Sequence, residues 1–154
     1  MTPERKAYLM SLVQYPQLTA AESNVARAWL EKHADEWDDV NFNVRLGTQL
    51  QLGDGFNDTT RAQAALLSQK RADLVATRGV EAAIIEVKIR IALAALGQLL
   101  GYDVLWRAEY PLTTNIRLIA IGHDALLDVV ELLQAHGVSV ELFPNVALAV
   151  LPYG

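Results

Sequence analysis

Cysteine is absent from this 154-residue chain. Without thiols the protein can have neither a disulfide framework nor a zinc–thiolate site, and its composition suits a reducing compartment. No apolar run approaches the roughly 20 residues that cross a bilayer, because the longest one, residues 91–100, contains Gly97 and Gln98. The opening residues, MTPERKAYLM, lack the apolar core and cleavage site of a signal peptide. We therefore expect a cytoplasmic protein with no membrane partner.

Several patterns that identify catalytic or metal sites are missing as well. The histidines do not have the spacing of metal ligands, and the serines do not occur in a nucleophile elbow. No glycine-rich phosphate loop is present. The turn-rich residues 53–58 lack the ladder of oxygen ligands and the closing glutamate of a calcium loop. These absences exclude histidine metal centres, serine hydrolases of that type and calcium loops.

The composition indicates one globular domain, residues 1–154, because 52% of the chain is hydrophobic and only 20% is charged. The net charge is −5, which is unfavourable for binding nucleic acid, because that affinity depends on neutralising phosphates. Residues 61–90, however, contain six basic and three acidic side chains. This segment therefore has a charge of +3, the remainder has −8, and the basic charge is concentrated in one part of the chain.

Residues 70–90 predict a β-hairpin. Two runs rich in Val, Ile, Ala and Leu flank the dipeptide Gly79-Val80. Glycine at the first central position suits a two-residue type II′ turn, whose twist matches that of the flanking strands. With this turn the register places Leu74 opposite Ile85, on a face that is wholly apolar.

The same register places Asp73 opposite Glu86, and Lys88 shares their face because side chains alternate along a strand. Two carboxylates directly opposite one another, with Cβ atoms about 5 Å apart, repel. A bound divalent cation would offset this repulsion, and Lys88 would help. The alternative interpretation is a salt bridge of Lys88 with Glu86 or Asp73 on a solvated edge.

The pattern D-x12-E-V-K, formed by Asp73, Glu86, Val87 and Lys88, resembles the PD-(D/E)XK nuclease superfamily, and both halves fall on predicted strands. The resemblance implies that Asp73 and Glu86 bind Mg²⁺ or Mn²⁺ and that the Val87 carbonyl adds a ligand. It also implies that Lys88 orients or activates the attacking water. The residue before Asp73 is Ala72, where the family often has proline.

A second motif follows the predicted hairpin. Gln98 and Tyr102 are four residues apart and therefore share one helical face. They resemble the Q-x3-Y motif of RecB-type members of the superfamily, which implies that both face the active site and position the substrate or its phosphate. The alternative is that Gln98 is a polar residue satisfied within the core and that Tyr102 packs on the sheet.

The order of predicted elements resembles the superfamily core, αβββαβ. It implies an α/β, restriction-endonuclease-like fold with a mixed central sheet flanked by helices. The core covers about residues 20–122, and residues 123–154 add a helix and a strand. We predict helices at residues 4–14, 20–34, 58–67, 89–107 and 125–135, and strands at residues 40–46, 72–78, 81–88, 116–122, 138–143 and 146–151.

Local signals add detail to these helices. Thr19 and Glu22 form a capping box at the start of the helix over residues 20–34. The helix over residues 89–107 is apolar almost all round, which predicts that it is buried. Asp124 is predicted to cap the helix over residues 125–135.

Further site residues are assigned by the resemblance. The helix before the core sheet often carries a glutamate that reaches the metal, and Glu22 and Glu31 are the candidates, although capping already accounts for Glu22. Lys70, Arg78 and Arg90 are predicted to contact substrate phosphates.

The predicted function is metal-dependent hydrolysis of nucleic-acid phosphodiester bonds, with DNA as the partner. The alternative is a non-catalytic interaction or structural module of the same fold within a larger nucleoprotein or virus-like assembly. The acidic balance of the chain favours this alternative. The sequence leaves open whether the protein forms a homo-oligomer.

Overall fold

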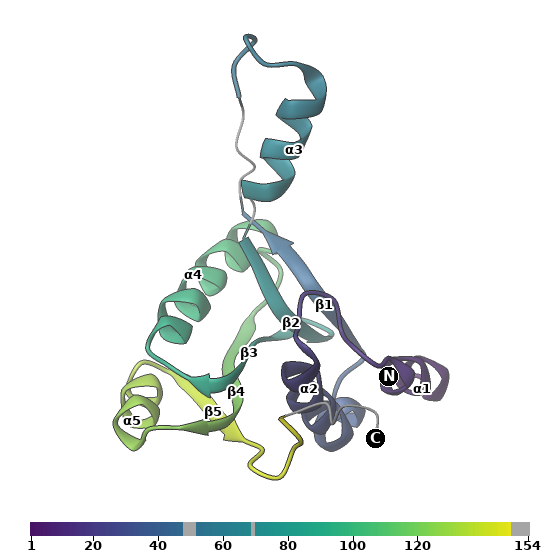
Figure 1. The fold of residues 1–154 in the computed structure, drawn as a ribbon, viewed down its shortest axis with the longest axis vertical. Coiled ribbons are helices and arrows are strands. Elements are labelled where there is room, and N and C mark those ends of the chain that lie inside the picture. The colour runs from purple at the N-terminus through teal and green to yellow at the C-terminus, as the bar shows by residue number, and fades with distance from the viewer. Residues whose placement is uncertain (48–51, 69, 149–154) are drawn as a thin grey trace, which may run out of the picture.

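The computed structural model describes residues 1–47, 52–68 and 70–148 (Figure 1). Its helices are α1 (Pro3–Ser11), α2 (Ala20–His33), α3 (Asp58–Ser68), α4 (Ala94–Glu109) and α5 (Leu127–Ala135), with a 3-10 turn η1 (Ala34–Glu36). Its strands are β1 (Asp39–Leu46), β2 (Lys70–Arg78), β3 (Glu81–Ile91), β4 (Asn115–Ala125) and β5 (Val138–Leu142).

The strands form one sheet in the order β1-β2-β3-β4-β5. The pairs β1/β2 and β2/β3 are antiparallel, whereas β3/β4 and β4/β5 are parallel. Parallel neighbours need a crossover connection, and α4 and α5 provide it. The predicted fold class, a restriction-endonuclease-like α/β core with a further helix and strand, is therefore confirmed.

Two apolar cores lie on opposite faces of the sheet. On one face, α1 and α2 pack over β1–β4, and α2 buries Val25, Trp29 and Leu30. On the other face, α4 and α5 pack over the sheet, and α4 buries Leu99 and Trp106. The two faces are called the α2 face and the α4 face below. β3 is the central strand of the sheet, and helices cover both faces, so its apolar residues are buried on both sides.

The predicted capping box of α2 is confirmed. The Thr19 hydroxyl accepts a hydrogen bond from the Glu22 N–H at 3.2 Å, and the Glu22 carboxylate accepts one from the Thr19 N–H at 2.9 Å. Two N–H groups at the helix start are thereby satisfied. This contact also fixes where α2 begins.

The hairpin is confirmed as well. Gly79 has φ +55°, while Val80 is not in the left-handed region, as expected for the two central residues of a type II′ turn. The strands pair in the predicted register, with Arg78 opposite Glu81 and Leu74 opposite Ile85.

The regular alternation predicted for residues 40–46 is wrong at its centre. Asn43 has φ +52°, a left-handed conformation that asparagine tolerates better than most residues. Val40 and Phe42 therefore pack on the α2 face, whereas Val44 and Leu46 pack on the α4 face. Because of this one left-handed residue, the even-numbered residues of β1 lie on the α2 face before Asn43 and on the α4 face after it.

The helix predicted over residues 89–107 is displaced and less buried than expected. β3 continues through Ile91, because its residues pair with β4 as far as Ala125, and α4 begins only at Ala94. One side of α4 faces solvent, with Val104 67% exposed, so the prediction of a buried helix is wrong. The polar residues of its solvent side, Arg107 and Glu109, come only near its end, so most of the helix lacks the pattern that normally identifies an exposed face.

Other boundaries also differ. α1 ends at Ser11, before the predicted residue 14, and α3 is capped by Asn57, whose side chain accepts from the Thr60 N–H at 2.7 Å. Asp124 does not cap α5, since it lies in β4, and α5 starts after Leu126 without a side-chain cap.

The predicted final strand, residues 146–151, is not found where the structure describes it. Residues 146–148 are not in a strand, and residues 149–151 lie outside the described residues.

The helix α3 projects away from the rest of the molecule along its longest axis (Figure 1). It lies in the connection between β1 and β2 and is not one of the elements of the predicted αβββαβ core. Among the residues described by the structure, no helix is long and apolar enough to span a membrane.

Candidate active site

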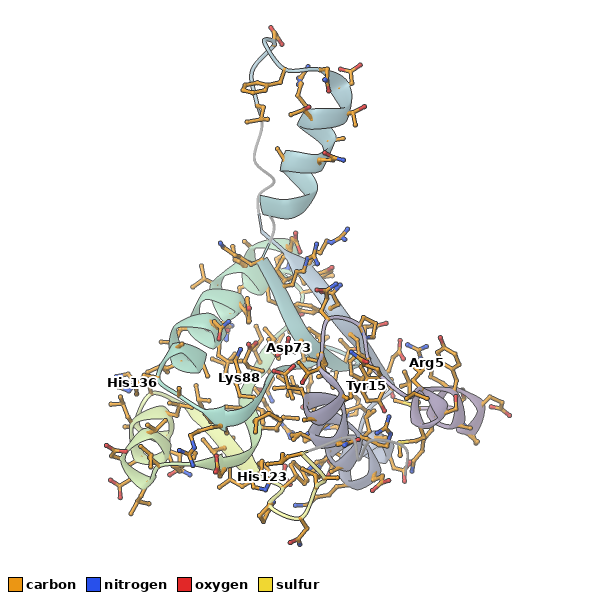
Figure 2. The ribbon with its side chains drawn as sticks, viewed as in Figure 1. Arg5, Tyr15, Asp73, Lys88, His123 and His136 are labelled. Atoms are coloured by element: carbon orange, nitrogen blue, oxygen red, sulfur yellow. The ribbon has the colours of Figure 1, made fainter. Side chains whose placement is uncertain are left out.

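The sheet divides between β2 and β3, and we call this place the fork. Their pairing runs from the turn as far as Leu74 and Ile85. Beyond that pair β2 continues beside β1 to Lys70, while β3 continues beside β4 to Ile91. Figure 2 shows Asp73 and Lys88 in this central region of the molecule. Neighbouring strands that separate leave backbone groups free to meet side chains.

Asp73 is the first residue of β2 beyond the last β2/β3 pair. Its Oδ2 accepts a hydrogen bond from the backbone N–H of Val87 at 2.8 Å, which ties the two strands together across the fork. Burial raises the pKa of the Asp73 carboxyl, and the Val87 hydrogen bond and the charge of Lys88 offset part of this rise. Asp73 and Glu86 therefore lie close together on either side of the fork, but the direct strand pairing predicted for them does not form, because the β2/β3 ladder ends at Leu74 and Ile85.

Glu86 is buried, with an exposure of 2%. Burial, followed by the neighbouring carboxylate of Asp73, raises the pKa of Glu86 from 4.5 to about 7. Its Oε2 is buried without a hydrogen-bond partner. An ionisable group with an unpartnered oxygen is costly to bury, which makes Glu86 a candidate for a functional role.

Lys88 extends from the same strand and lies over Glu86, with its Nζ 3.2 Å from Glu86 Oε1. The salt bridge given above as an alternative is thus present, but it occupies one oxygen of Glu86 only. The side chain of Lys88 is 37% exposed, whereas that of Glu86 is 3% exposed. The ammonium therefore stands between the buried carboxylate and the solvent.

A cleft of about 670 Å³ is lined by α4 and the start of β2, and its Tyr102 senses the charges of Glu86 and Asp73, although neither carboxylate lines it. Gln98, Tyr102 and Lys70 all contribute to its wall. The Oε1 atom of Gln98 is buried without a partner. Burial and then the charges of Glu86 and Asp73 raise the pKa of Tyr102 to about 12, so its hydroxyl keeps its proton and can donate a hydrogen bond.

The two glutamates of α2 occupy different positions. Glu22 acts electrostatically on Asp73, raising the pKa of that carboxyl, so it lies near the fork. Its carboxylate is already held in the capping box. Glu31 is exposed, nine residues further along the helix.

Across residues 1–47, 52–68 and 70–148, no three Asp, Glu, His or Cys side chains converge into a metal-binding cluster.

The three predicted phosphate contacts are not equivalent. Lys70 lines the cleft. Arg78 lies at the turn end of the hairpin and is bound to Glu81 at 2.6 Å, about 17 Å along the strand from Asp73. Arg90 is held by Asp124 through hydrogen bonds of 2.9 Å. Of these three residues, Lys70 alone is both near the fork and without a carboxylate partner in the described part of the chain.

Gly122 is a residue of the site that sequence reasoning missed. It pairs with Lys88, and a Cβ built on it would lie 2.8 Å from the Lys88 carbonyl oxygen and 2.8 Å from Ile91 Cγ1. β4 therefore approaches the backbone of β3 closely where β3 carries Lys88. A glycine within a predicted strand is a signal of such an approach.

We expect Gly122→Ala to destabilise the protein by about 1–3 kcal/mol, because the added methyl group must displace the backbone of β3. Chemical denaturation followed by circular dichroism measures this. Gly101→Ala is the matched control, since its Cβ meets nothing within 4 Å and alanine stabilises a helix interior by roughly 0.5–1 kcal/mol. Equal stability of Gly122→Ala and wild type would show that the strands do not need this close contact.

These features define the class of protein: a restriction-endonuclease-like α/β fold with two carboxylates, Asp73 and Glu86, at the fork of its sheet, and with a mainly apolar cleft to which Lys70, Gln98 and Tyr102 contribute polar groups. No family model matches the sequence, and no curated protein matches it.

Three solved structures are similar to the chain. A repair endonuclease from Pyrococcus abyssi is 16% identical with a TM-score of 0.48, and the match covers 84% of this chain and 48% of that one. EndoMS in complex with double-stranded DNA is 16% identical with a TM-score of 0.46, over the same shares. AF1548, a protein of unknown function, is 11% identical with a TM-score of 0.47, over 78% of this chain and 56% of that one. The chain thus spans about half the length of each, and a likeness of this size carries no information on substrate.

Proposed function

We propose that this protein is a metal-dependent nuclease that hydrolyses phosphodiester bonds of DNA. The observation that carries the proposal is the pair of carboxylates at the fork, of which Glu86 is buried with an unpartnered oxygen beneath Lys88. Nothing in the fold alone requires a buried, mutually repelling pair at this position. A nuclease site accounts for both the carboxylates and the nearby polar side chains of Lys70, Gln98 and Tyr102 in the cleft.

The residues fit a divalent cation. Carboxylate oxygens are ligands for Mg²⁺ and Mn²⁺, and the carboxylates of Asp73 and Glu86 together with the Val87 carbonyl would hold the ion. The unpartnered Glu86 Oε2 is the atom that most needs such a partner. When bound, the cation would offset the charge of the phosphate and lower the pKa of water at the site.

The other polar side chains around the fork and the cleft then each have a role. Lys88 places its ammonium beside Glu86, where it can position the attacking water and stabilise the negative charge that develops on the phosphate. Tyr102 keeps its hydroxyl proton and donates to the substrate from α4. Gln98 offers its buried amide oxygen one helical turn away, and Lys70 attracts the phosphate backbone from the opposite wall of the cleft.

Calorimetric titration with Mg²⁺ or Mn²⁺ is expected to show binding that Asp73→Ala abolishes. The affinity should fall roughly tenfold for each pH unit below the Glu86 pKa of about 7, because protons compete for that carboxylate. Asp103→Ala is the control, since Asp103 is paired with Arg107 on the surface of α4. Equal ion binding by wild type and Asp73→Ala would place the ion elsewhere.

Incubation of single-stranded, duplex and branched DNA with Mg²⁺ or Mn²⁺ tests the activity itself. We expect wild type to cut at least one substrate and Glu86→Ala to cut none. If wild type cuts nothing, or if Glu86→Ala cuts equally well, the nuclease proposal fails. The non-catalytic interaction module then becomes the better account, and light scattering of the intact chain would test for its assembly.

A further inference from the structure

Three basic residues stand apart from the other basic residues of the molecule. The chain has 13 lysines and arginines, and ten of them contact a carboxylate, an amide or carbonyl oxygen, or the ring of Trp37. Among the described residues, Arg45, Lys70 and Arg71 have no hydrogen bond, ion pair or ring contact of their side chains. Unpaired cations are unexpected in a chain with 18 acidic residues.

The three residues are neighbours in the sheet. Arg45 pairs with Arg71 across β1 and β2, and Leu46 pairs with Lys70 in the next position. Like charges directly opposite one another on antiparallel strands destabilise the pair. Arg71 is also partly buried, which limits how far its charge can be solvated. An anionic partner would remove this repulsion.

These residues lie on the two-stranded ribbon where β2 has left β3 and pairs only with β1. Leu46 and Ala72 belong to the core of the α4 face, so Arg45 and Arg71, whose positions alternate with theirs, point to the opposite face. Lys70 lines the cleft on the α4 face. The ribbon therefore carries cations on both of its faces.

A ribbon charged on both faces fits double-stranded DNA. A duplex presents two phosphate backbones, one on each side of a groove, whereas a single strand offers one, so cations that point in two directions suit the duplex. Arginine binds phosphate through two parallel N–H groups. Arg71 is two residues from Asp73, about 7 Å along β2, so DNA held by the ribbon lies next to the fork.

We propose that the ribbon of Arg45, Lys70 and Arg71 is a phosphate-binding surface for duplex DNA, which delivers the duplex to the fork. This inference rests on the proposed nuclease function and specifies its substrate as double-stranded. The contacts are to the backbone and hold the duplex without reading its sequence.

Fluorescence anisotropy of the full chain with a labelled duplex, and with one of its single strands, tests the surface. Binding is measured in EDTA, so that no DNA is cut, over about 50–200 mM salt. The magnitude of the slope of the logarithm of the association constant K against the logarithm of the salt concentration should be lower by roughly 1.8 in the double variant Arg45→Gln/Arg71→Gln. The affinity of this double variant for the duplex should fall about 60-fold at about 0.1 M salt. The single variant Lys70→Gln should lower the magnitude of the slope by roughly 0.9. Arg107→Gln is the matched control, because Arg107 is already paired with Asp103.

A melting temperature at or above that of wild type shows that the double variant is folded, since the substitution removes a repulsion. The proposal is overturned if the folded double variant keeps the wild-type slope, if the single strand binds more tightly than the duplex, or if a poly-glutamate peptide binds as tightly as DNA. The last result would indicate an acidic protein as the partner. Metal-dependent cleavage with an unchanged slope would refute the surface alone, whereas a reduced slope without any cleavage would refute the nuclease alone.

Discussion

Lys88→Ala is expected to lower the rate of DNA cleavage by about 100-fold or more while leaving the fold intact. Lys88 is the cation that lies over the buried Glu86, with its Nζ 3.2 Å from that carboxylate. Its loss removes the ammonium that positions water and stabilises charge on the phosphate. Because Lys88 is 37% exposed, its truncation leaves no cavity that would unfold the protein.

The measurement is single-turnover cleavage at saturating Mg²⁺ or Mn²⁺. Saturation matters because losing Lys88 also raises the pKa of Glu86 further and so weakens ion binding. Lys6→Ala serves as the control, since it removes a lysine paired with Asp35 on the surface. Retention of the wild-type rate by Lys88→Ala under these conditions would leave Lys88 with a structural role only.

Glu86→Gln is expected to stabilise the metal-free protein by roughly 3 kcal/mol at about pH 8.5. The pKa of Glu86 is 4.5 in the unfolded chain and about 7 in the folded one. As the pH rises between these values, the unfolded state loses the proton while the folded state keeps it, so stability falls and stays low above the folded pKa. Glutamine has no proton to lose, so the variant avoids this decrease.

Thermal unfolding in EDTA measures the difference, which corresponds to roughly 6–12 °C for a protein of this size. The gain should disappear at about pH 4, where Glu86 is protonated in both states. Glu81→Gln is the matched control on the same strand. Arg78 lowers the pKa of Glu81, so its neutralisation should give no gain. A stability difference for Glu86→Gln that does not vary with pH would contradict the assignment of a high pKa to Glu86.

Strand contacts along the hairpin could be predicted from the sequence because they are local. The glycine at position 79 determines the turn, and the turn determines every pair of residues back to Leu74 and Ile85. The same holds for the capping box of Thr19 and Glu22, whose partners are three residues apart. The proximity of Asp73, Glu86 and Lys88 followed from these rules alone.

Predictions failed where a local pattern depends on distant residues. The apolar run that suggested a helix from residue 89 is strand as far as Ile91, because β4 is available to pair with it. Asp124 resembles a helix cap in sequence, yet Arg90 holds it in β4. Asn43 reverses the faces of β1 through a backbone conformation that hydrophobic alternation does not reveal.

The sequence by itself determined the register of the hairpin as far as Leu74 and Ile85, the nearness of Asp73 to Glu86 and the lysine two residues after Glu86, since turn geometry acts over a few residues. Only the tertiary structure decided that β2 and β3 separate at Asp73, that Glu86 Oε2 is buried without a partner and that Arg45 meets Arg71. Burial and pairing depend on which strands and helices cover a residue, and these come from parts of the chain far away in sequence. The pKa of Glu86 is therefore a property of the folded sheet, although its nearness to Asp73 could be inferred by counting from Gly79.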